Sequence, residues 1–191
     1  MLVKNIKEEI QASIDTKHQV LNDGKLLDQI LDLAEKCTEV LKLGGKVIFC
    51  GNGGSFADAQ HLSAEFTSRF MFDRPGLASI ALGTNSSAMT AIGNDYGYEY
   101  VFARELQAIA NPNDFLIAIT TSGNSLNILK AIESAQDIKL PLVVFTGESN
   151  GKLQEDTTTL NIPSSNTARI QECHILIGHI VCGLVESEIF G

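Results

Sequence analysis

A short apolar run that ends in a glycine-rich turn constrains the fold of this sequence more than any other feature. Residues 46–50 form the run, and the turn Gly51-Asn52-Gly53-Gly54-Ser55 follows it and opens a helical pattern. Glycines allow positive φ angles and a close approach of the backbone to a ligand. Free N–H groups at a helix start, with the positive end of the helix dipole, suit phosphate or sugar oxygens. We therefore expect a strand, an anion-binding turn and a helix, the alternative being a tight turn that binds nothing.

Further apolar patterns repeat this strand–helix unit along the chain. The runs typical of buried strands are 46–50, 77–82, 114–120 and 141–146, with a weaker one at 157–162. Helical spacing of apolar residues covers 3–20, 26–43, 55–70, 86–93, 98–110, 125–137 and 167–189. This alternation predicts a single domain over residues 1–191, with a parallel sheet covered by helices on both faces. The ligand site of such a sheet lies beyond the carboxyl ends of its strands.

Composition excludes several classes of partner. The chain of 191 residues has a formal net charge of −9 and no cluster of Lys or Arg. Because binding to nucleic-acid backbones depends on such clusters, we expect no nucleic-acid partner. The sequence has no unbroken apolar run of about 18 residues, as a membrane-spanning helix needs, and its N-terminus mixes charges unlike a secretory signal. We therefore expect a cytoplasmic protein without a membrane partner, whose cysteines serve packing.

A second polar turn follows the strand expected at 114–120. It places four hydroxyls around a single glycine just before a helix, on Thr120, Thr121, Ser122 and Ser125. One hydroxyl is enough to cap a helix, and we expect one of the four to do so. The excess favours phosphate binding, in which hydroxyls and backbone N–H groups solvate the anion without Lys or Arg.

Two of the expected helices carry polar stripes. His61 and Glu65 are four residues apart and so project from one helix face. On the last helix, Gln171 and His179 belong to one stripe, with His174 to its side. The simpler interpretations are a helix-surface pair and buried polar residues with partners in the core. If the stripes meet, two imidazoles, a carboxylate and an amide oxygen would form a site acceptable to Zn²⁺.

Two other regions lead to weaker expectations. Asn94 and Asp95 indicate an irregular turn between helices, which Asx-turn chemistry explains without a ligand. The N-terminal helices within residues 1–45 and the last helix carry more apolar surface than one small sheet needs for cover. Such surplus surface predicts that these helices contribute to an oligomer.

Several separated blocks of the sequence resemble the sugar isomerase (SIS) fold and, within it, the phosphoheptose isomerase family. The blocks agree in order and spacing, nearly end to end: Cys50 to Ser55, Asp58 to His61, Ala64 to Phe66, Gly93 to Tyr98, Thr121 to Ser125 and Arg169 to Glu172, followed by His174 and His179. The resemblance implies an α/β fold, a three-layer α-β-α sandwich of flavodoxin-like type on a five-stranded parallel sheet. Extra N-terminal helices and a long C-terminal helix complete it. A homotetramer with active sites at subunit interfaces is implied as well.

The resemblance also implies an activity and the residues that carry it. The reaction is the conversion of D-sedoheptulose 7-phosphate to D-glycero-D-manno-heptose 7-phosphate through an enediol, in bacterial heptose synthesis for lipopolysaccharide or capsule. Glu65 is expected to be the base and His179 the acid. One Zn²⁺ per subunit is expected on His61, Glu65, Gln171 and His179. Contacts to the sugar phosphate are expected from Asn52, Gly53, Gly54, Ser55, Asn94, Asp95, Thr120, Thr121, Ser122, Ser125 and Gln171.

Some alternatives are left open by the sequence. A Glu or His bound tightly to zinc transfers protons poorly, so the metal and acid–base roles of Glu65 and His179 compete or alternate. The leading alternative function is a non-catalytic binding module resembling the DnaA initiator-associating protein, which has no need of the four expected zinc ligands. A third is an isomerase or sensor for another sugar phosphate, such as arabinose 5-phosphate, although such proteins usually carry appended regulatory domains.

Overall fold

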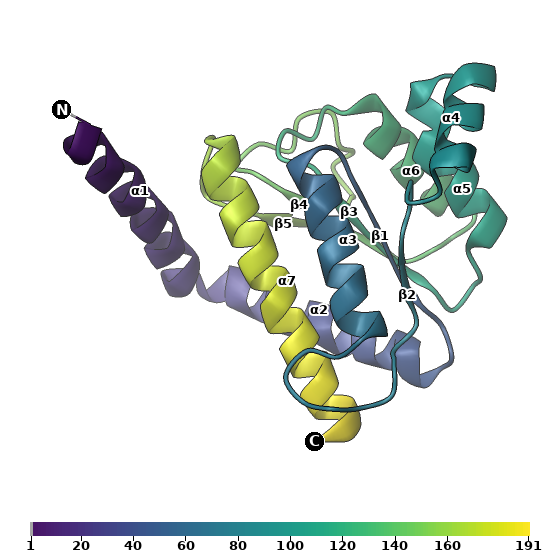
Figure 1. The fold of residues 1–191 in the computed structure, drawn as a ribbon, viewed down its shortest axis with the longest axis horizontal. Helices are drawn as coiled ribbons and strands as arrows, with labels where there is room; N and C mark the ends of the chain where they lie inside the picture. Colours follow the sequence, from purple (N-terminus) through teal and green to yellow (C-terminus); the bar gives the residue numbers. More distant parts are fainter. Residues whose placement is uncertain (1) are drawn as a thin grey trace.

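The structure, a computed structural model, describes residues 2–191, and within them seven α-helices and one 3-10 helix accompany five strands (Figure 1). The elements, in chain order, are α1 (Leu2–Asn22), α2 (Gly24–Lys42), β1 (Val47–Gly51), α3 (Gly54–Thr67), β2 (Ser79–Ala81), α4 (Ser86–Asp95), η1 (Tyr98–Tyr100), α5 (Val101–Ile109), β3 (Phe115–Ile119), α6 (Leu126–Asp137), β4 (Leu142–Thr146), β5 (Thr159–Asn161) and α7 (Thr167–Phe190). Each apolar run that predicted a strand contains one.

The strands form one parallel sheet in the order β2-β1-β3-β4-β5. The strand order reverses between β1 and β3, because β2 lies on one side of β1 and the later strands lie on the other. Open α/β sheets bind ligands at such a point, beyond the carboxyl ends of the strands. In the register of β1 and β3, Gly51 lies opposite Ile119. The two polar turns that leave these strands therefore begin side by side.

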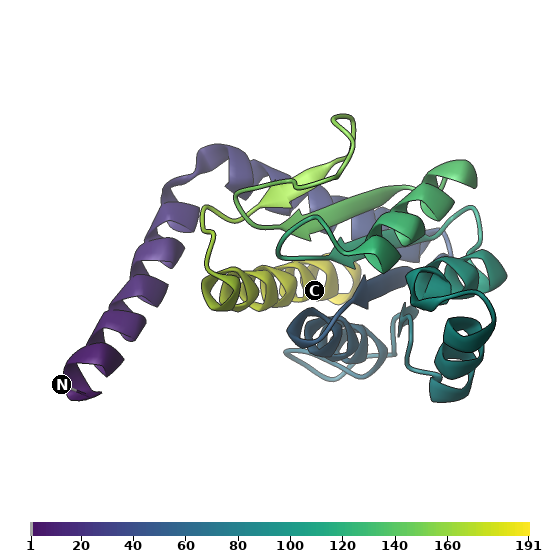
Figure 2. The ribbon, with the colours of Figure 1, turned by 90° about the horizontal axis from the view of Figure 1, so that it is seen from above.

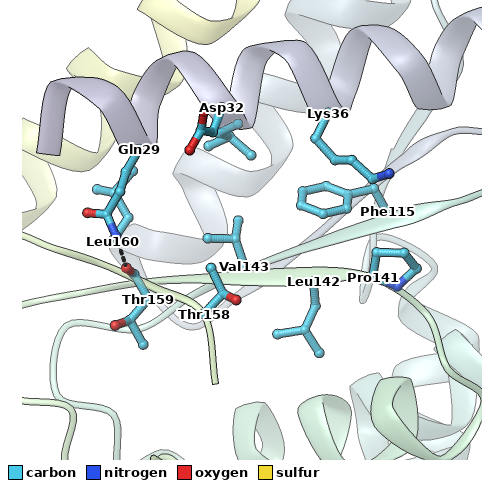
Figure 3. A pocket seen from close by; sticks show the side chains of 11 residues that line it. Gln29, Asp32, Lys36, Phe115, Pro141, Leu142, Val143, Thr158, Thr159 and Leu160 are labelled. Carbon is cyan, nitrogen blue, oxygen red and sulfur yellow. Dashed lines mark hydrogen bonds between the residues drawn. The ribbon is translucent and has the colours of Figure 1, made fainter. Parts of the chain in front are cut away.

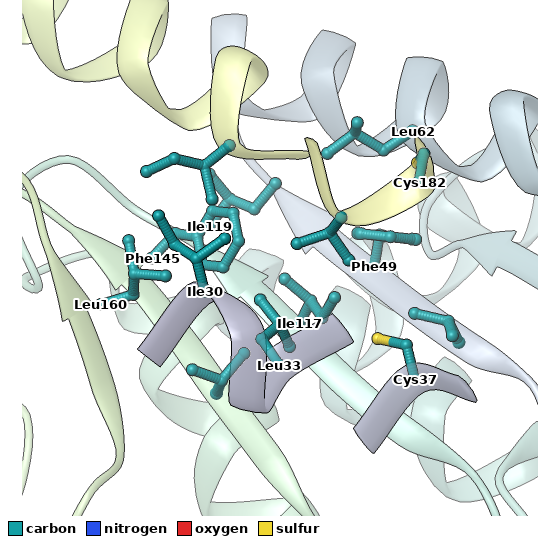
Figure 4. Packing of buried hydrophobic residues seen from close by; sticks show 14 of the residues in the cluster. Ile30, Leu33, Cys37, Phe49, Leu62, Ile117, Ile119, Phe145, Leu160 and Cys182 are labelled. Carbon is teal, nitrogen blue, oxygen red and sulfur yellow. The ribbon is translucent and has the colours of Figure 1, made fainter. Parts of the chain in front are cut away.

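Helices cover both faces of the sheet, as the views in Figures 1 and 2 show. Successive residues of a strand point to opposite faces. Phe49 and Ile117 belong to a core shared with α2, α3 and α7 (Figure 4). Their neighbours Ile48 and Leu116 belong to a second core, shared with α5 and α6. The expected α-β-α sandwich is thus confirmed.

The long C-terminal helix α7 lies in the larger core. Within residues 2–191 it is the one helix long and apolar enough, by length and composition, to cross a membrane. Its residues Cys173, Ile177, Val181 and Val185, at spacings of four, are buried against the sheet, α2 and α3. This packing accounts for the apolar residues on one face of α7.

Two local expectations were wrong. The helix expected over 55–70 ends at Thr67, because the Arg74 side chain takes the carbonyl oxygens of Phe66 and Ser68 as acceptors. Asn94 and Asp95 do not form an irregular turn. They lie in the last turn of α4, which continues until Tyr96 donates its N–H to the carbonyl of Ile92.

One histidine of α7 belongs to the core. His174 is 0% exposed, its Nε2 lies 3.2 Å from the carbonyl oxygen of Thr146, and its ring packs on Phe145 at a centroid distance of 5.5 Å. Burial lowers the pKa of His174 to about 4, and the hydrogen bond to Thr146 opposes this shift only partly. The imidazole is therefore neutral at pH 7 and donates its Nε2–H to Thr146.

We expect this neutral histidine to make stability depend on pH. In the unfolded chain His174 has its ordinary pKa of 6.5, so unfolding takes up a proton between pH 6.5 and about 4. Its contribution to stability is complete above pH 6.5 and is lost as the pH falls, by about 3 kcal/mol below pH 4. Urea denaturation at pH 7 and pH 4.5 should show a smaller pH effect for His174→Phe than for the wild type or for His18→Phe, a change at an exposed histidine. Equal pH effects in all three would contradict this account.

Candidate functional site

The first turn, between β1 and α3, has a backbone that a ligand could approach closely. Gly53 has φ +56° and provides no side-chain cap for α3, so the N–H groups at this helix start have no side-chain acceptor. A Cβ atom on Gly51 would lie 2.4 Å from the carbonyl oxygen of Ser55. On Gly54 it would lie 2.6 Å from Nε2 of Gln171, which α7 brings to this turn. A side chain at position 51 would therefore collide with backbone, whereas one at position 54 would displace the flexible end of Gln171.

The second turn, between β3 and α6, keeps hydroxyls available. Thr120 is buried, and its Oγ1 accepts the N–H of Gly123 at 3.3 Å. Ser122 lies exposed, with its Oγ accepting the N–H of Asn124 at 3.3 Å. Ser125 occupies the N-cap position of α6, but its side chain makes no capping hydrogen bond, contrary to the expectation that one hydroxyl would cap. Only its carbonyl joins the helix, which leaves the hydroxyl free for a ligand.

An amide pair links the two turns. Asn52 donates to Oδ1 of Asn127, and Asn127 donates to Oδ1 of Asn52, each at 2.8 Å. The Tyr98 hydroxyl also donates to Oδ1 of Asn52, at 3.3 Å. Because Tyr98 closely follows Asn94 and Asp95, the end of α4 is brought toward the first turn. The exposed Asn94 donates to Oδ1 of Asp95 at 2.8 Å.

The polar stripes of α3 and α7 do meet. Nε2 of His61 lies 2.8 Å from Nε2 of His179 and 3.1 Å from Oε1 of Glu65. One ligand atom from each of these three residues fits within 4.8 Å of the others. We call His61, Glu65 and His179 the histidine–glutamate cluster. The His61 side chain is 50% exposed and that of Glu65 22%, so the cluster opens to solvent.

Gln171 lies nearer the amino-terminal end of α7 than His179 does. It precedes His179 by eight residues, which places the two about 12 Å apart along α7. Its amide packs against Gly54 at the glycine-rich turn. Within one chain, therefore, three of the four expected zinc ligands come together, whereas Gln171 lies beside the glycine-rich turn.

Asp58 lies one turn before His61 on α3. Its Oδ2 is buried and has no hydrogen-bond partner among residues 2–191. Loss of solvation raises the pKa of this carboxyl to about 6, against the opposing effect of His61. α3 therefore carries a second carboxyl group beside the cluster. Asp58 belongs to one of the sequence blocks that resemble the family, but the resemblance assigns it no role.

Comparison with known proteins identifies the family. The SIS domain family model matches residues 10–147. The phosphoheptose isomerase of Aneurinibacillus thermoaerophilus is 52% identical over 186 residues, which cover 97% of this chain and 94% of the relative. Phosphoheptose isomerase 2 of Campylobacter jejuni is 50% identical over 187 residues, with coverage of 97% and 93%. The chain belongs to the phosphoheptose isomerase family.

Solved structures of phosphoheptose isomerases share the whole fold. That from Neisseria gonorrhoeae has a TM-score of 0.89 and 38% identity, covering 98% of this chain and 100% of its own. That from Francisella tularensis has a TM-score of 0.91 and 37% identity, with coverage of 98% and 99%. The family and the fold expected from the sequence are confirmed, and the alternative of a non-catalytic binding module is not favoured.

A hollow of about 550 Å³ between α2 and the sheet lies apart from this site (Figure 3). It is lined by residues at the amino-terminal ends of β3 and β4, such as Phe115 and Leu142, and by Thr159 of β5, whose carbonyl accepts from Gln29 at 3.2 Å. The turns lie at the opposite end of β1 and β3, and no residue of the histidine–glutamate cluster lines the hollow. In this family member the hollow therefore takes no part in the candidate active site.

Proposed function

We propose that this member of the phosphoheptose isomerase family interconverts D-sedoheptulose 7-phosphate and D-glycero-D-manno-heptose 7-phosphate. The observation that carries the proposal is the histidine–glutamate cluster on the packed helices α3 and α7, of which α3 begins at the glycine-rich turn and α7 brings Gln171 to the same turn. The family is one of isomerases, and the protein is accordingly an enzyme. A cytoplasmic location and a role in heptose synthesis for lipopolysaccharide or capsule form part of the proposal.

The two turns would hold the substrate's phosphate and sugar hydroxyls. Hydroxyls of Thr120, Thr121, Ser122 and Ser125 and the backbone at Gly53, Gly54 and Ser55 would bind the phosphate, which needs no Lys or Arg when such donors converge. The remaining polar contacts are assigned to Asn52, Asn94, Asp95 and Gln171. The amide pair with Asn127 would fix the orientation of Asn52.

The cluster would carry out proton transfer. Glu65 would remove a proton from C1 while His179 gives one to the carbonyl oxygen at C2, which produces the enediol. A proton then returns to C2, and the C1 hydroxyl loses its proton to leave the aldehyde. No electrons leave the sugar, so the reaction needs no redox partner.

The same donors fit a divalent metal. Two imidazole nitrogens and a carboxylate oxygen, all within 4.8 Å of one another, are ligands that Zn²⁺ accepts. His61, Glu65 and His179 would hold the ion. Gln171 would be a fourth ligand only if an assembly of several chains placed it closer to the cluster than it lies in one isolated chain. When bound, zinc supplies Lewis acidity toward the substrate carbonyl.

The test is incubation of the purified protein with sedoheptulose 7-phosphate, with detection of the aldoheptose phosphate by chromatography or NMR. We expect product from the wild type, and the assay is repeated with zinc added and after chelation. Absence of product in every condition, from a folded protein, would refute the isomerase. Binding to DnaA in a pull-down would then support the alternative module.

Exposed apolar stripes support a homotetramer with active sites at subunit interfaces. In α1 only Thr16 and Val20 are buried, although the helix spans 21 residues. It projects from the rest of the chain (Figures 1 and 2). A stripe at spacings of four is exposed along it, formed by Leu2, Ile6, Ile10 and Ile14. On α7, Leu176, Ile180 and Leu184 are also exposed. Because Ile180 adjoins His179, a second copy covering this stripe would reach the cluster.

We expect Ile10→Asp to break this assembly. A charge on the apolar stripe of α1 would have to be buried in the interface without a partner, which is strongly unfavourable. Light scattering at micromolar concentration should give four times the chain mass of 20.6 kDa for the wild type and a smaller mass for the variant. Asn5→Asp, which adds the same charge on another face of α1, should leave the mass unchanged. A wild type that scatters as a monomer would refute the assembly.

A further inference from the structure

The loop after α3 is anchored to α7 by one buried carboxylate. The Glu186 side chain is 0% exposed and accepts hydrogen bonds from the backbone N–H of Phe70 at 2.9 Å and of Met71 at 2.6 Å. It also accepts from Nε of Arg74 at 2.9 Å. Glu186 lies seven residues, or about two turns, beyond His179. The carboxylate therefore sets the position of residues 70 and 71 relative to that histidine.

Arg74, in the loop between α3 and β2, completes the anchor. Its side chain is 2% exposed, and its guanidinium donates to the carbonyl oxygens of Glu65, Phe66, Ser68 and Pro75. Nη2 of Arg74 donates to the carbonyl oxygen of Glu65 at 2.9 Å. Because Glu65 and Phe66 belong to the last turn of α3, the guanidinium ties the end of the helix that carries His61 and Glu65 to α7.

Phe70 is the part of this loop that reaches the cluster. Its ring stacks on the imidazole of His179, with centroids 5.5 Å apart and an interplanar angle of 21°. The ring of His61 meets the same imidazole nearly edge-on, at 5.0 Å and 67°. His179 is thus confined between an aromatic face and the histidine whose Nε2 it contacts. A rotation of its side chain would lose one contact or both.

We propose that Phe70, held in place by Glu186 and Arg74, is a positioning residue that fixes the imidazole of His179 in the histidine–glutamate cluster. This inference rests on the proposed function, since it assigns the device that orients one of the reacting groups. Phe70 itself presents only a hydrocarbon ring and takes no part in proton transfer. Removal of the hydrogen-bonded groups that orient a metal-binding histidine typically changes metal affinity or activity by about 10–100-fold, and we expect removal of a ring that confines the imidazole to act in the same direction.

The substitution that tests the proposal is Phe70→Leu, which keeps an apolar side chain but removes the ring. We expect kcat with sedoheptulose 7-phosphate to fall about tenfold or more, with KM changed less than about twofold, because the turns that bind the phosphate are untouched. Zinc affinity, measured by calorimetry, should fall by a similar factor. Phe70→Tyr, which retains the ring, should restore both. Phe72→Leu, a matched change at an exposed residue of the same loop, should leave both at the wild-type level.

A substrate-independent measurement separates this proposal from the proposed function. The imidazole proton signals of His179, identified by their loss in His179→Gln, should carry the ring-current shift of Phe70 in wild type and Phe72→Leu and lose it in Phe70→Leu. If the wild type fails to isomerise the substrate, these signals and the zinc affinity decide the positioning role alone. Signals that do not move in Phe70→Leu would overturn it. So would unchanged kcat and zinc affinity in a folded Phe70→Leu protein, as judged by thermal melting.

Discussion

Glu65→Gln should lower the rate of heptose phosphate isomerisation by at least 10²-fold, because a general base contributes about 10²–10⁴-fold. The amide matches the carboxylate in shape but cannot take a proton from C1. Oε1 of Glu65 also lies 3.1 Å from Nε2 of His61, so the change weakens the metal-binding donor set as well. The measurement is the steady-state rate with sedoheptulose 7-phosphate at saturating concentration.

The control for this prediction is Glu99→Gln, a change at a residue of η1 outside the cluster. It should retain the wild-type rate, and both variants should melt within a few degrees of the wild type. Turnover by Glu65→Gln above about a tenth of the wild-type rate would remove Glu65 from the chemistry, since it lies far outside the range for loss of a base.

Glu186→Leu should destabilise the fold by about 3–5 kcal/mol, the usual result of removing one partner from a buried ion pair. The substitution leaves the guanidinium of Arg74 buried without its carboxylate, and the N–H groups of Phe70 and Met71 lose their acceptor. Burial alone would raise the pKa of Glu186, but these hydrogen bonds and the arginine hold it below its usual range. The carboxylate is therefore charged at neutral pH, and its removal should lower the free energy of unfolding by the whole of this amount.

Urea denaturation of the folded protein measures this loss. Glu188→Leu is the matched control, because Glu188 lies two residues further along α7 and pairs with Lys42 at the surface. An exposed pair contributes about 0–1 kcal/mol, so the control should stay close to the wild type. A loss below about 1 kcal/mol in Glu186→Leu, less than the cost of leaving one buried polar group unsatisfied, would contradict the account.

The sequence predicted the fold through features that act over short distances. Alternating apolar runs and glycine turns determine local structure, and each expected strand contains an observed one. The turns at Gly51 and Thr120 could be assigned to one edge of the sheet, because parallel strands share a direction. The meeting of His61 with His179 needed the packing of α3 on α7, which spacing alone does not determine. The residues come from two stripes, His61 with Glu65 and Gln171 with His179, and the sequence offers their meeting as one interpretation beside the simpler ones.

Other parts of the site could not be read from the chain. Asn127 contacts Asn52, 75 residues away, and Arg74 contacts Glu186, 112 residues away. No local pattern marks either pair, because an isolated Asn or Arg in an amphipathic segment is usually solvated. The expected extension of α3 to residue 70 had a related cause. Apolar periodicity continues through Phe66 and Phe70, whereas in the structure the guanidinium of Arg74 donates to carbonyl groups in the last turn of the helix.

The placement of Gln171 and His179 on one straight helix has a consequence for the choice of substrate. Eight residues of α7 span about 12 Å, and seven residues of α3, from Gly54 to His61, span about 10 Å. Hydrogen-bonded helices resist stretching, so the distance between the glycine-rich turn and the histidine–glutamate cluster is fixed. A sugar phosphate anchored at the turns would reach Glu65 with its first two carbons only if its carbon chain covers that length. Shorter sugars would bind by the phosphate and stop before the cluster, so that helical rise would help to select the number of carbons.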